Sequence, residues 1–260
     1  MEKTFYDAAK DGNVDVVKSI LRKNPSLNVN WKNEEEDAMT ALYAACNQGH
    51  DSVVSILLAH PDIDPNLKEK YGWTPFMTAC YNGNTSCVRE MLQDQRVMVN
   101  EPSDNGRTPL RYAACFGHLD IIKWWIASGR EMDLGTPGDV DMTDAIGVSK
   151  ARGKTEMATL LERFKKNRVE TRYSMRVELG LLDELAAEMF ALVVFVSDGL
   201  LQVNDTTTTP SPAARFFNIA RRLPLELQML LCYCVVGSAK EIIPGHYSEV
   251  AFKELARRLW

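Results

Sequence analysis

The sequence predicts an all-α solenoid of about five helix–turn–helix repeats, followed by a C-terminal helical bundle. The first observation is a glycine that ends each of five short helical segments and recurs every 34 to 37 residues, at Gly12, Gly49, Gly83, Gly117 and Gly153. The second is a threonine, a residue that can cap a helix, at the start of the three middle segments. The third is a run of apolar residues at helical spacing after each glycine, which predicts a second helix.

The stretch 108–118 shows the predicted unit most fully. Thr108 can accept a hydrogen bond from the first turn, and Pro109 suits the first helical position, where an N–H group would be unpaired anyway. Gly117 can adopt the left-handed conformation that ends a helix. After it, Ile121, Ile122, Trp125 and Ile126 lie at helical spacing. The unit is therefore a helix, a tight turn and a second helix.

A period of about 33 residues with a T-P-L-H-x-A core is the signature of ankyrin repeats. The chain resembles the ankyrin-repeat family over about residues 2–165, within a predicted repeat domain of residues 1–167. The predicted repeats are 2–31, 38–66, 67–100, 101–134 and 135–165. The end copies depart most from the motif, as expected for repeats that have a neighbour on one side only. Tyr43, Met77 and Arg111 replace the family's histidine, which weakens a local hydrogen bond in each turn.

The resemblance implies β-hairpin-like fingers between consecutive repeats. Gly72 and Gly106 each stand two residues before the capping threonine, where a turn needs positive φ. The connection before the second repeat is three residues longer than the next two and carries four consecutive acids, Glu34-Glu35-Glu36-Asp37. These acids could contact a basic partner, or they could form a solvated loop.

Residues 168–260 read as a separate helical domain that packs on the last repeat. The stretch 177–196 begins amphipathic and becomes apolar all round, which predicts a helix with a buried end. A polar segment bounded by proline follows at 204–212. Further helices are expected over 213–223, 225–236 and 248–260.

Composition excludes several classes of protein. A net charge of −5 argues against a general nucleic-acid or membrane-surface binder. The sequence shows no signal peptide and no apolar segment long enough to span a bilayer, so we expect a cytoplasmic protein with no membrane partner. The six cysteines lack zinc spacing and read as small core residues. We expect a monomer.

The sequence predicts no enzyme, no cofactor and no metal site. It shows no nucleophile paired with a base, no metal cluster and no phosphate-binding loop. His50 and His118 follow turn glycines, where the resemblance implies a structural hydrogen bond. Asn30, Asn66 and Asn100 match the family's asparagine at the end of each repeat, which we interpret as a structural cap, with hydroxylation as the alternative.

The resemblance also implies a concave binding face, lined by the fingers and by the exposed ends of the inner helices. The candidate partner-binding residues on it are Lys70, Tyr71, Trp73, Tyr81, Asn82, Arg107, Arg111, Phe116 and Arg152. Aromatic and arginine side chains are the usual anchors of protein interfaces. We hypothesise that a central patch binds a protein or peptide; it consists of Tyr71, Trp73, Tyr81, Arg107 and Phe116. The alternative is that these aromatic rings only pack against one another or against the loop at 32–39.

The C-terminal segment suggests an alternative function. Residues 223–227, Leu-Pro-Leu-Glu-Leu, are similar to the opening of an F-box and to the L-P-L-P stretch of a SOCS box. Both modules recruit ubiquitin-ligase scaffolds, so the alternative function is a substrate-recruiting adaptor of a ubiquitin ligase. The same pattern also arises from the physics of helix starts alone. Burial of Leu225, Leu227, Leu230 and Leu231 inside the bundle would exclude the adaptor.

Overall fold

The computed structural model describes residues 1–136, 144–197 and 225–235, together with residues 216, 218–220, 222, 223 and 251. The chain divides into two compact units, Met1–Met175 and Arg176–Trp260. The two units are described separately below. Their division falls within helix α11 (Arg168–Glu178). The domain limits predicted from the sequence, 1–167 and 168–260, and the packing of the second domain on the last repeat stay predictions.

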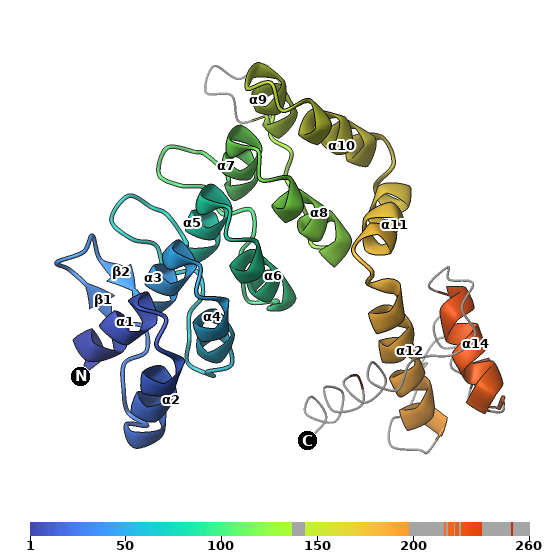
Figure 1. Cartoon of the computed structure of the whole chain (residues 1–260), viewed down its shortest axis with the longest axis horizontal. Helices are drawn as coiled ribbons and strands as arrows, with labels where there is room; N and C mark the ends of the chain where they lie inside the picture. Colours follow the sequence, from blue (N-terminus) through green and yellow to red (C-terminus); the bar gives the residue numbers. More distant parts are fainter. Residues whose placement is uncertain are drawn as a thin grey trace, which may run out of the picture. The chain divides into compact units, whose positions relative to one another are not determined.

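The described part of the N-terminal unit consists of helix pairs stacked in chain order (Figure 1). The pairs are α1 (Glu2–Lys10) with α2 (Val14–Lys23), α3 (Ala41–Gln48) with α4 (Asp51–Leu58), α5 (Pro75–Asn82) with α6 (Thr85–Gln93), α7 (Pro109–Phe116) with α8 (Leu119–Ser128), and α9 (Ala145–Ala151) with α10 (Thr155–Lys166). Each first, or inner, helix packs against the next inner helix, and each second, or outer, helix against the next outer helix. This arrangement confirms the predicted all-α solenoid.

Capping residues set the limits of the inner helices. The hydroxyl of Thr74 accepts a hydrogen bond from the backbone N–H of Met77, and Thr40 and Thr108 cap α3 and α7 in the same way. At the other end, Gly83 ends α5 with a φ of +78°. A β-carbon at Gly83 would also lie 2.6 Å from the His118 ring, so both the backbone and the neighbouring repeat require glycine there.

Polar side chains at two positions of the repeat join neighbouring repeats among the first four. His50 Nε2 donates to the carbonyl of Lys10 at 3.0 Å, and His118 Nε2 donates to that of Tyr81 at 2.9 Å. Asn66 donates to the carbonyl of Arg96 at 2.8 Å and accepts the N–H of Met98 at 2.7 Å. Asn30 and Asn100 make the equivalent pair of bonds. The structural hydrogen bond predicted for each histidine is present, and the three asparagines have a structural role as well, in bonding one repeat to the next; their hydroxylation stays an untested alternative.

The fingers are present in the middle repeats. Before α3, β1 (Lys32–Asn33) pairs antiparallel with β2 (Met39–Thr40). The later fingers close with backbone bonds from Glu69 to Trp73 and from Ser103 to Arg107, both 3.0 Å. Gly72 and Gly106 have φ of +78° and +71°, as the sequence predicts.

The acids of the second finger, which is the β1–β2 hairpin before α3 of the second repeat, pair with lysines of the same unit. Lys3 lies 3.0 Å from the Glu35 carboxylate, and Lys10 lies 2.6 Å from that of Glu36. The hydroxyl of Tyr6 also donates to Glu36 at 3.1 Å. Lys70 of the next finger approaches Asp37 to 3.9 Å. These pairs tie the finger to α1 and to its neighbour, while Glu34 stays exposed.

The five cysteines whose side chains the structure describes are free thiols. Cys46, Cys80 and Cys87 have no exposed surface, and burial raises the pKa of the Cys87 thiol to about 12. Cys232 is buried as well. These four are the small core residues that the sequence predicts, whereas Cys115 at the end of α7 is only half-buried. The side chain of Cys234 lies outside the described residues.

In the C-terminal unit, α12 (Leu182–Ser197) packs against α14 (Leu225–Val235). Their shared core includes Phe190, Val193 and Tyr233. The prediction of one helix over 177–196 is wrong at its start, because Gly180 adopts a φ of +72° between α11 and α12 and breaks the helix. The helices expected over 213–223 and 248–260 lie largely outside the described residues. No helix of the described part is both long and apolar enough to cross a membrane.

Candidate protein-binding face

Four aromatic side chains of the third and fourth repeats form a continuous cluster. Ring centres lie 4.6 Å apart for Trp73 and Tyr112, 5.1 Å for Trp73 and Tyr81, and 4.7 Å for Tyr81 and Phe116. Most of these pairs meet edge to face, a geometry that adds attraction beyond burial. We call Trp73, Tyr81, Tyr112 and Phe116 the aromatic cluster. The surface formed by the fingers and the C-terminal ends of the inner helices is called the finger face.

The fold brings these rings together from three elements. The carboxylate of Glu69, which is 7% exposed, accepts the backbone N–H groups of Tyr71 at 2.9 Å and Trp73 at 3.0 Å. These two bonds hold the finger in place and position Trp73 directly before Thr74, the N-cap of α5. Tyr81 lies near the end of α5, and Phe116 is the last residue of α7. Because α5 and α7 pack side by side, the two helix ends present adjacent rings.

The rings of the cluster differ in exposure. Tyr112 is buried at 5% exposure and Trp73 is half-buried, whereas Tyr81 remains 37% and Phe116 47% exposed. Tyr112 and Trp73 therefore form a packed base, and Tyr81 and Phe116 form a rim open to solvent. The alternative, that the aromatic rings only pack against one another, accounts for the base. It does not account for the exposed surface of Tyr81 and Phe116 at the rim.

Lys70 and Tyr71 lie at the tip of the third finger, beside each other. Tyr71 is 57% exposed, and the Lys70 ammonium lies 5.7 Å from the centre of its ring. The backbone N–H of Lys70 donates to the carbonyl of Asp37 at 2.8 Å, which joins the second and third fingers. Among the described residues, no ring contact connects Tyr71 to the aromatic cluster.

The remaining predicted residues are spread along the finger face. Asn82 is exposed and donates to Asn47 Oδ1 at 2.8 Å, which bridges the second and third repeats. The Arg111 guanidinium lies 5.7 Å from the ring centre of Tyr112, so it borders the cluster. Arg107 closes the fourth finger and is half-buried, and Arg152 is exposed directly after α9. The structure thus brings Trp73, Tyr81, Phe116 and Arg111 together and leaves the others around them.

Tyr112, which lies at the centre of the cluster, was not predicted from the sequence as a binding-face residue. A signal for it exists in the repeat pattern. Five residues before the turn glycine, the second and third repeats carry the small residues Ala44 and Thr78, and only the fourth repeat among these three carries a large ring. A bulky side chain at a position that is otherwise small must find space beyond the helix interface, here between Trp73 and Tyr81.

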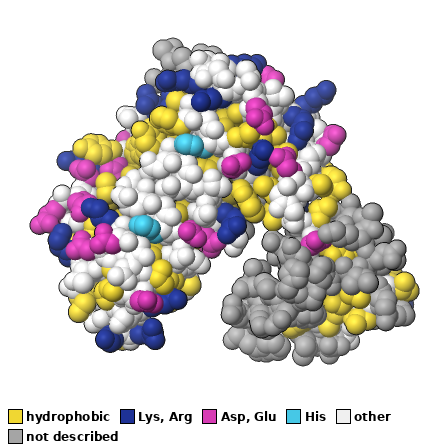
Figure 2. All heavy atoms as spheres, in the orientation of Figure 1, with side chains coloured by type: hydrophobic (Ala, Val, Ile, Leu, Met, Phe, Trp, Pro, Cys, Tyr) yellow, Lys and Arg dark blue, Asp and Glu magenta, His cyan; other side chains and the backbone are white. Residues whose placement is uncertain are grey.

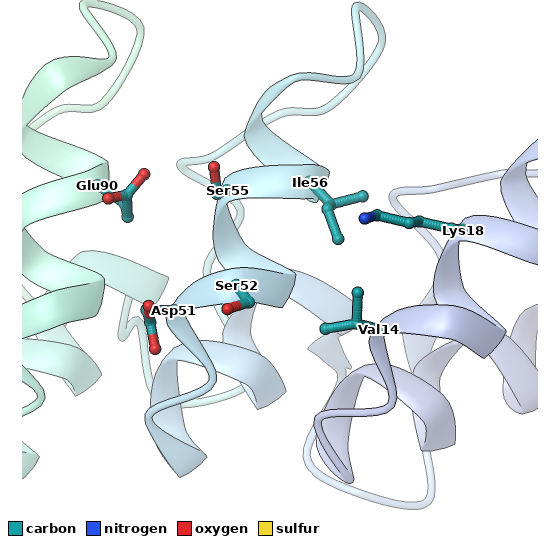
Figure 3. A pocket seen from close by; sticks show the side chains of 7 residues that line it. All are labelled: Val14, Lys18, Asp51, Ser52, Ser55, Ile56 and Glu90. Carbon is teal, nitrogen blue, oxygen red and sulfur yellow. The ribbon is translucent and has the colours of Figure 1, made fainter. Parts of the chain in front are cut away.

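A hollow of about 460 Å³ lies on the opposite, outer-helix side of the same unit (Figure 3). It is lined by Val14, Lys18, Asp51, Ser52, Ser55, Ile56 and Glu90. Figure 3 shows Lys18 extending toward Ile56, and Glu90 on the far wall. The hollow contains none of the predicted residues, and no group of three or more His, Cys, Asp or Glu side chains in the described part of the chain could hold a metal ion.

Comparison with known proteins identifies the repeats. A family model described as ankyrin repeats (3 copies) matches residues 5–66 and 61–135, which together make up half of the chain. The chain belongs to the ankyrin-repeat family. Ankyrin repeats imply protein–protein interaction.

Several curated proteins share part of this ankyrin-repeat sequence. Human "SMC5-SMC6 complex localization factor protein 1" is 37% identical over 111 residues, which cover 43% of the chain and 10% of the relative. The rice protein "Probable E3 ubiquitin-protein ligase XBOS31" is 30% identical over 122 residues, 47% of the chain and 27% of the relative. An ankyrin repeat-containing protein of Schizosaccharomyces pombe is 30% identical over 112 residues, 42% of the chain and 46% of the relative. The matches thus span a tenth to just under half of the length of these relatives.

Proposed function

We propose that the repeats of residues 1–167 form a non-catalytic scaffold that binds a protein or peptide on the finger face. The observation that carries the proposal is the exposed rim of the aromatic cluster, where Tyr81 and Phe116 stay 37% and 47% exposed although each packs against another ring. Rings already held in place lose little conformational freedom when a partner covers them. They therefore supply apolar contact area at low entropic cost.

The surroundings of the rim support the same proposal. Arg111 borders the base of the cluster. Tyr71 is exposed on the third finger, which also carries Trp73, and Asn82 is exposed at the end of α5, next to Tyr81. Polar groups around an apolar centre are the usual arrangement of a protein interface. Stacked repeats also present an extended surface rather than a closed pocket, which suits a peptide or a protein surface. Membership of the ankyrin-repeat family supports a protein partner of this kind.

Site-specific photo-crosslinking tests the proposal with the full chain. A photoreactive phenylalanine analogue at position 116, and in a second variant at position 71, is irradiated in an extract of the source cells. We expect a discrete crosslinked protein with both variants, identified by mass spectrometry. The matched control carries the analogue at Ile56 on the outer-helix side. Equal capture at position 56, or no capture at 116 and 71, would contradict a partner on the finger face.

One observation favours the adaptor as a second candidate function. On α14, Leu225 is 53% and Leu227 47% exposed, while Cys232 and Tyr233 of the same helix are buried. The two leucines are therefore accessible at the helix start, where the F-box-like and SOCS-box-like stretch lies. Leu231 is half-buried, and the side chain of Leu230 lies outside the described residues. A rice relative named as a probable ubiquitin ligase is consistent with this candidate.

Direct binding tests the adaptor. The purified full chain is titrated with the scaffold subunits that F-box and SOCS-box modules bind, alongside the double variant Leu225→Glu/Leu227→Glu. We expect binding that the double variant abolishes. The control is Ile219→Glu, because Ile219 is 60% exposed in the same unit but lies outside the motif. Absence of binding to either scaffold would reject the adaptor.

The cellular setting expected from the sequence stays a prediction. We propose a cytoplasmic monomer that binds neither nucleic acid nor membranes. Light scattering of the purified chain tests its oligomeric state, and imaging of the tagged chain tests its location.

A further inference from the structure

Three basic side chains of repeats four and five lie on the part of the finger face next to the aromatic cluster. The side chain of Lys154 lies over Gly117, directly beyond Phe116. A β-carbon built at Gly117 would lie 2.8 Å from Lys154 Cε and 3.1 Å from its Nζ. Lys154 and Arg152 are both exposed, and Arg107 is half-buried on the fourth finger. Basic groups therefore border the rim on the side of repeats four and five.

Two acids of the fifth repeat already have partners within that repeat. The carboxylate of Asp144 caps α9 by accepting the N–H groups of Ile146 at 3.1 Å and Gly147 at 2.9 Å. Glu162 pairs with Lys150 at 2.5 Å. Asp104 on the fourth finger is the exposed acid nearest in sequence to Arg107. Within the part of the chain that the structure describes, no ion pair joins a carboxylate to Arg107, Arg152 or Lys154.

The other end of the finger face has a different electrostatic character. There the acids Glu35, Glu36 and Asp37 are matched by Lys3, Lys10 and Lys70. Figure 2 shows the two signs intermixed around the β1–β2 finger, and Lys and Arg side chains gathered over α9. Because the whole chain carries a net charge of −5, the basic area at repeats four and five is a local departure from the average.

We propose that the segment bound on the finger face is an acidic peptide with one aromatic or large aliphatic anchor. This inference rests on the proposed function and adds the chemistry of its partner. The anchor packs on Tyr81 and Phe116, and the flanking Asp or Glu side chains face Arg107, Arg152 and Lys154. A single-stranded nucleic acid also combines rings with negative charge. The acidic net charge and the exposed Glu34 disfavour such a long polyanion, whereas a short acidic segment needs only repeats three to five.

Selection from a random peptide display library, with the immobilised full chain as bait, tests the inference. We expect enrichment of Asp and Glu around a single Phe, Tyr, Trp or Leu. A synthetic peptide of the enriched sequence is then titrated by fluorescence anisotropy against the full chain. Matched peptides replace its acids by lysine or its anchor by alanine, and we expect each replacement to weaken binding by about tenfold or more. A single-stranded oligonucleotide serves as the polyanion control.

Charge reversal locates the acidic part of the ligand. Arg152→Glu changes an exposed side chain after α9, so we expect it to leave thermal unfolding unchanged and to weaken the peptide by about fivefold, more strongly at low salt. Arg107→Glu is the second variant and should act in the same direction. Lys18→Glu is the matched control, because Lys18 is exposed on α2 and lines the hollow on the outer-helix side.

Each other outcome overturns the inference in a recognisable way. Enriched peptides that lack acids but lose binding with Phe116→Ala would overturn the acidic partner and leave the proposed function standing. Enriched peptides insensitive to Phe116→Ala, or no enrichment, would overturn both. An oligonucleotide that binds as tightly as the peptide, or a Lys18→Glu effect equal to that of Arg152→Glu, would also overturn the inference.

Discussion

The division of the aromatic cluster into a packed base and an exposed rim predicts that two aromatic-to-alanine substitutions have different costs. Tyr112 is 5% exposed and contacts the rings of both Trp73 and Tyr81. Tyr112→Ala would leave a cavity between them, so we expect a loss of about 3 kcal/mol in the free energy of unfolding. Phe116 is 47% exposed, so about half of its apolar surface is never buried. Phe116→Ala should therefore cost only about 1 kcal/mol.

Urea unfolding of the full chain, followed by tryptophan fluorescence, measures the difference. Trp31, Trp73, Trp124 and Trp125 all lie in the N-terminal unit, and Trp73 lies in the cluster itself, so the signal reports mainly on that unit. A gap of about 2 kcal/mol corresponds to a roughly 30-fold difference in the folding equilibrium. Equal losses for the two variants would refute the assignment of Phe116 to an exposed rim and would favour packing as the role of all four rings.

Two further predictions concern the scaffold that holds this face. Gly83→Ala should destabilise the chain by more than about 1 kcal/mol, because it combines a φ of +78° with a contact of 2.6 Å to His118. Gly153→Ala, with a φ of +67° and no atom within 4 Å of the added carbon, should cost less in the same thermal melt, and a reversed order would contradict the proposed contact. The hydrogen bond from Lys10 lowers the pKa of the Glu36 carboxyl below its ordinary value of 4.5. The contacts of the ionised Glu36 carboxylate therefore stabilise the fold fully above a pH of 4.5, and this stabilisation is lost as the pH falls through the lowered pKa. Acid titration of the urea midpoint should therefore show a smaller loss in Lys10→Ala than in the parent, and equal losses would exclude this pair as a source of acid sensitivity.

Features that depend on residues close in sequence could be predicted from the sequence. The start and end of α3, α5 and α7 follow from a capping threonine and a glycine nine residues later, so Thr108 and Gly117 mark α7 without any knowledge of the neighbours. The histidine that follows the glycine is also placed by this local pattern, and His118 makes the inter-repeat bond that the repeat implies.

Features that depend on contacts between distant residues were harder to predict. Arg96 donates to the carbonyl of Leu58 at the end of α4, and Arg130 donates to that of Asp94 after α6. Nothing near either arginine in the sequence indicates a helix end 36 or 38 residues away. The role of Tyr112 likewise depends on Trp73 of the preceding repeat. The break at Gly180 was not predicted either, because apolar residues at helical spacing continue on both sides of it within 177–196.

Intermolecular nuclear Overhauser effects between a bound peptide and the aromatic rings of the full chain test the central claim most directly. With the selected peptide unlabelled and the phenylalanine and tyrosine rings of the chain carbon-13 labelled, the account predicts contacts from the peptide anchor to Phe116 and Tyr81. Contacts confined to Val14 and Ile56 of the hollow on the outer-helix side, in a sample with labelled methyl groups, would contradict it.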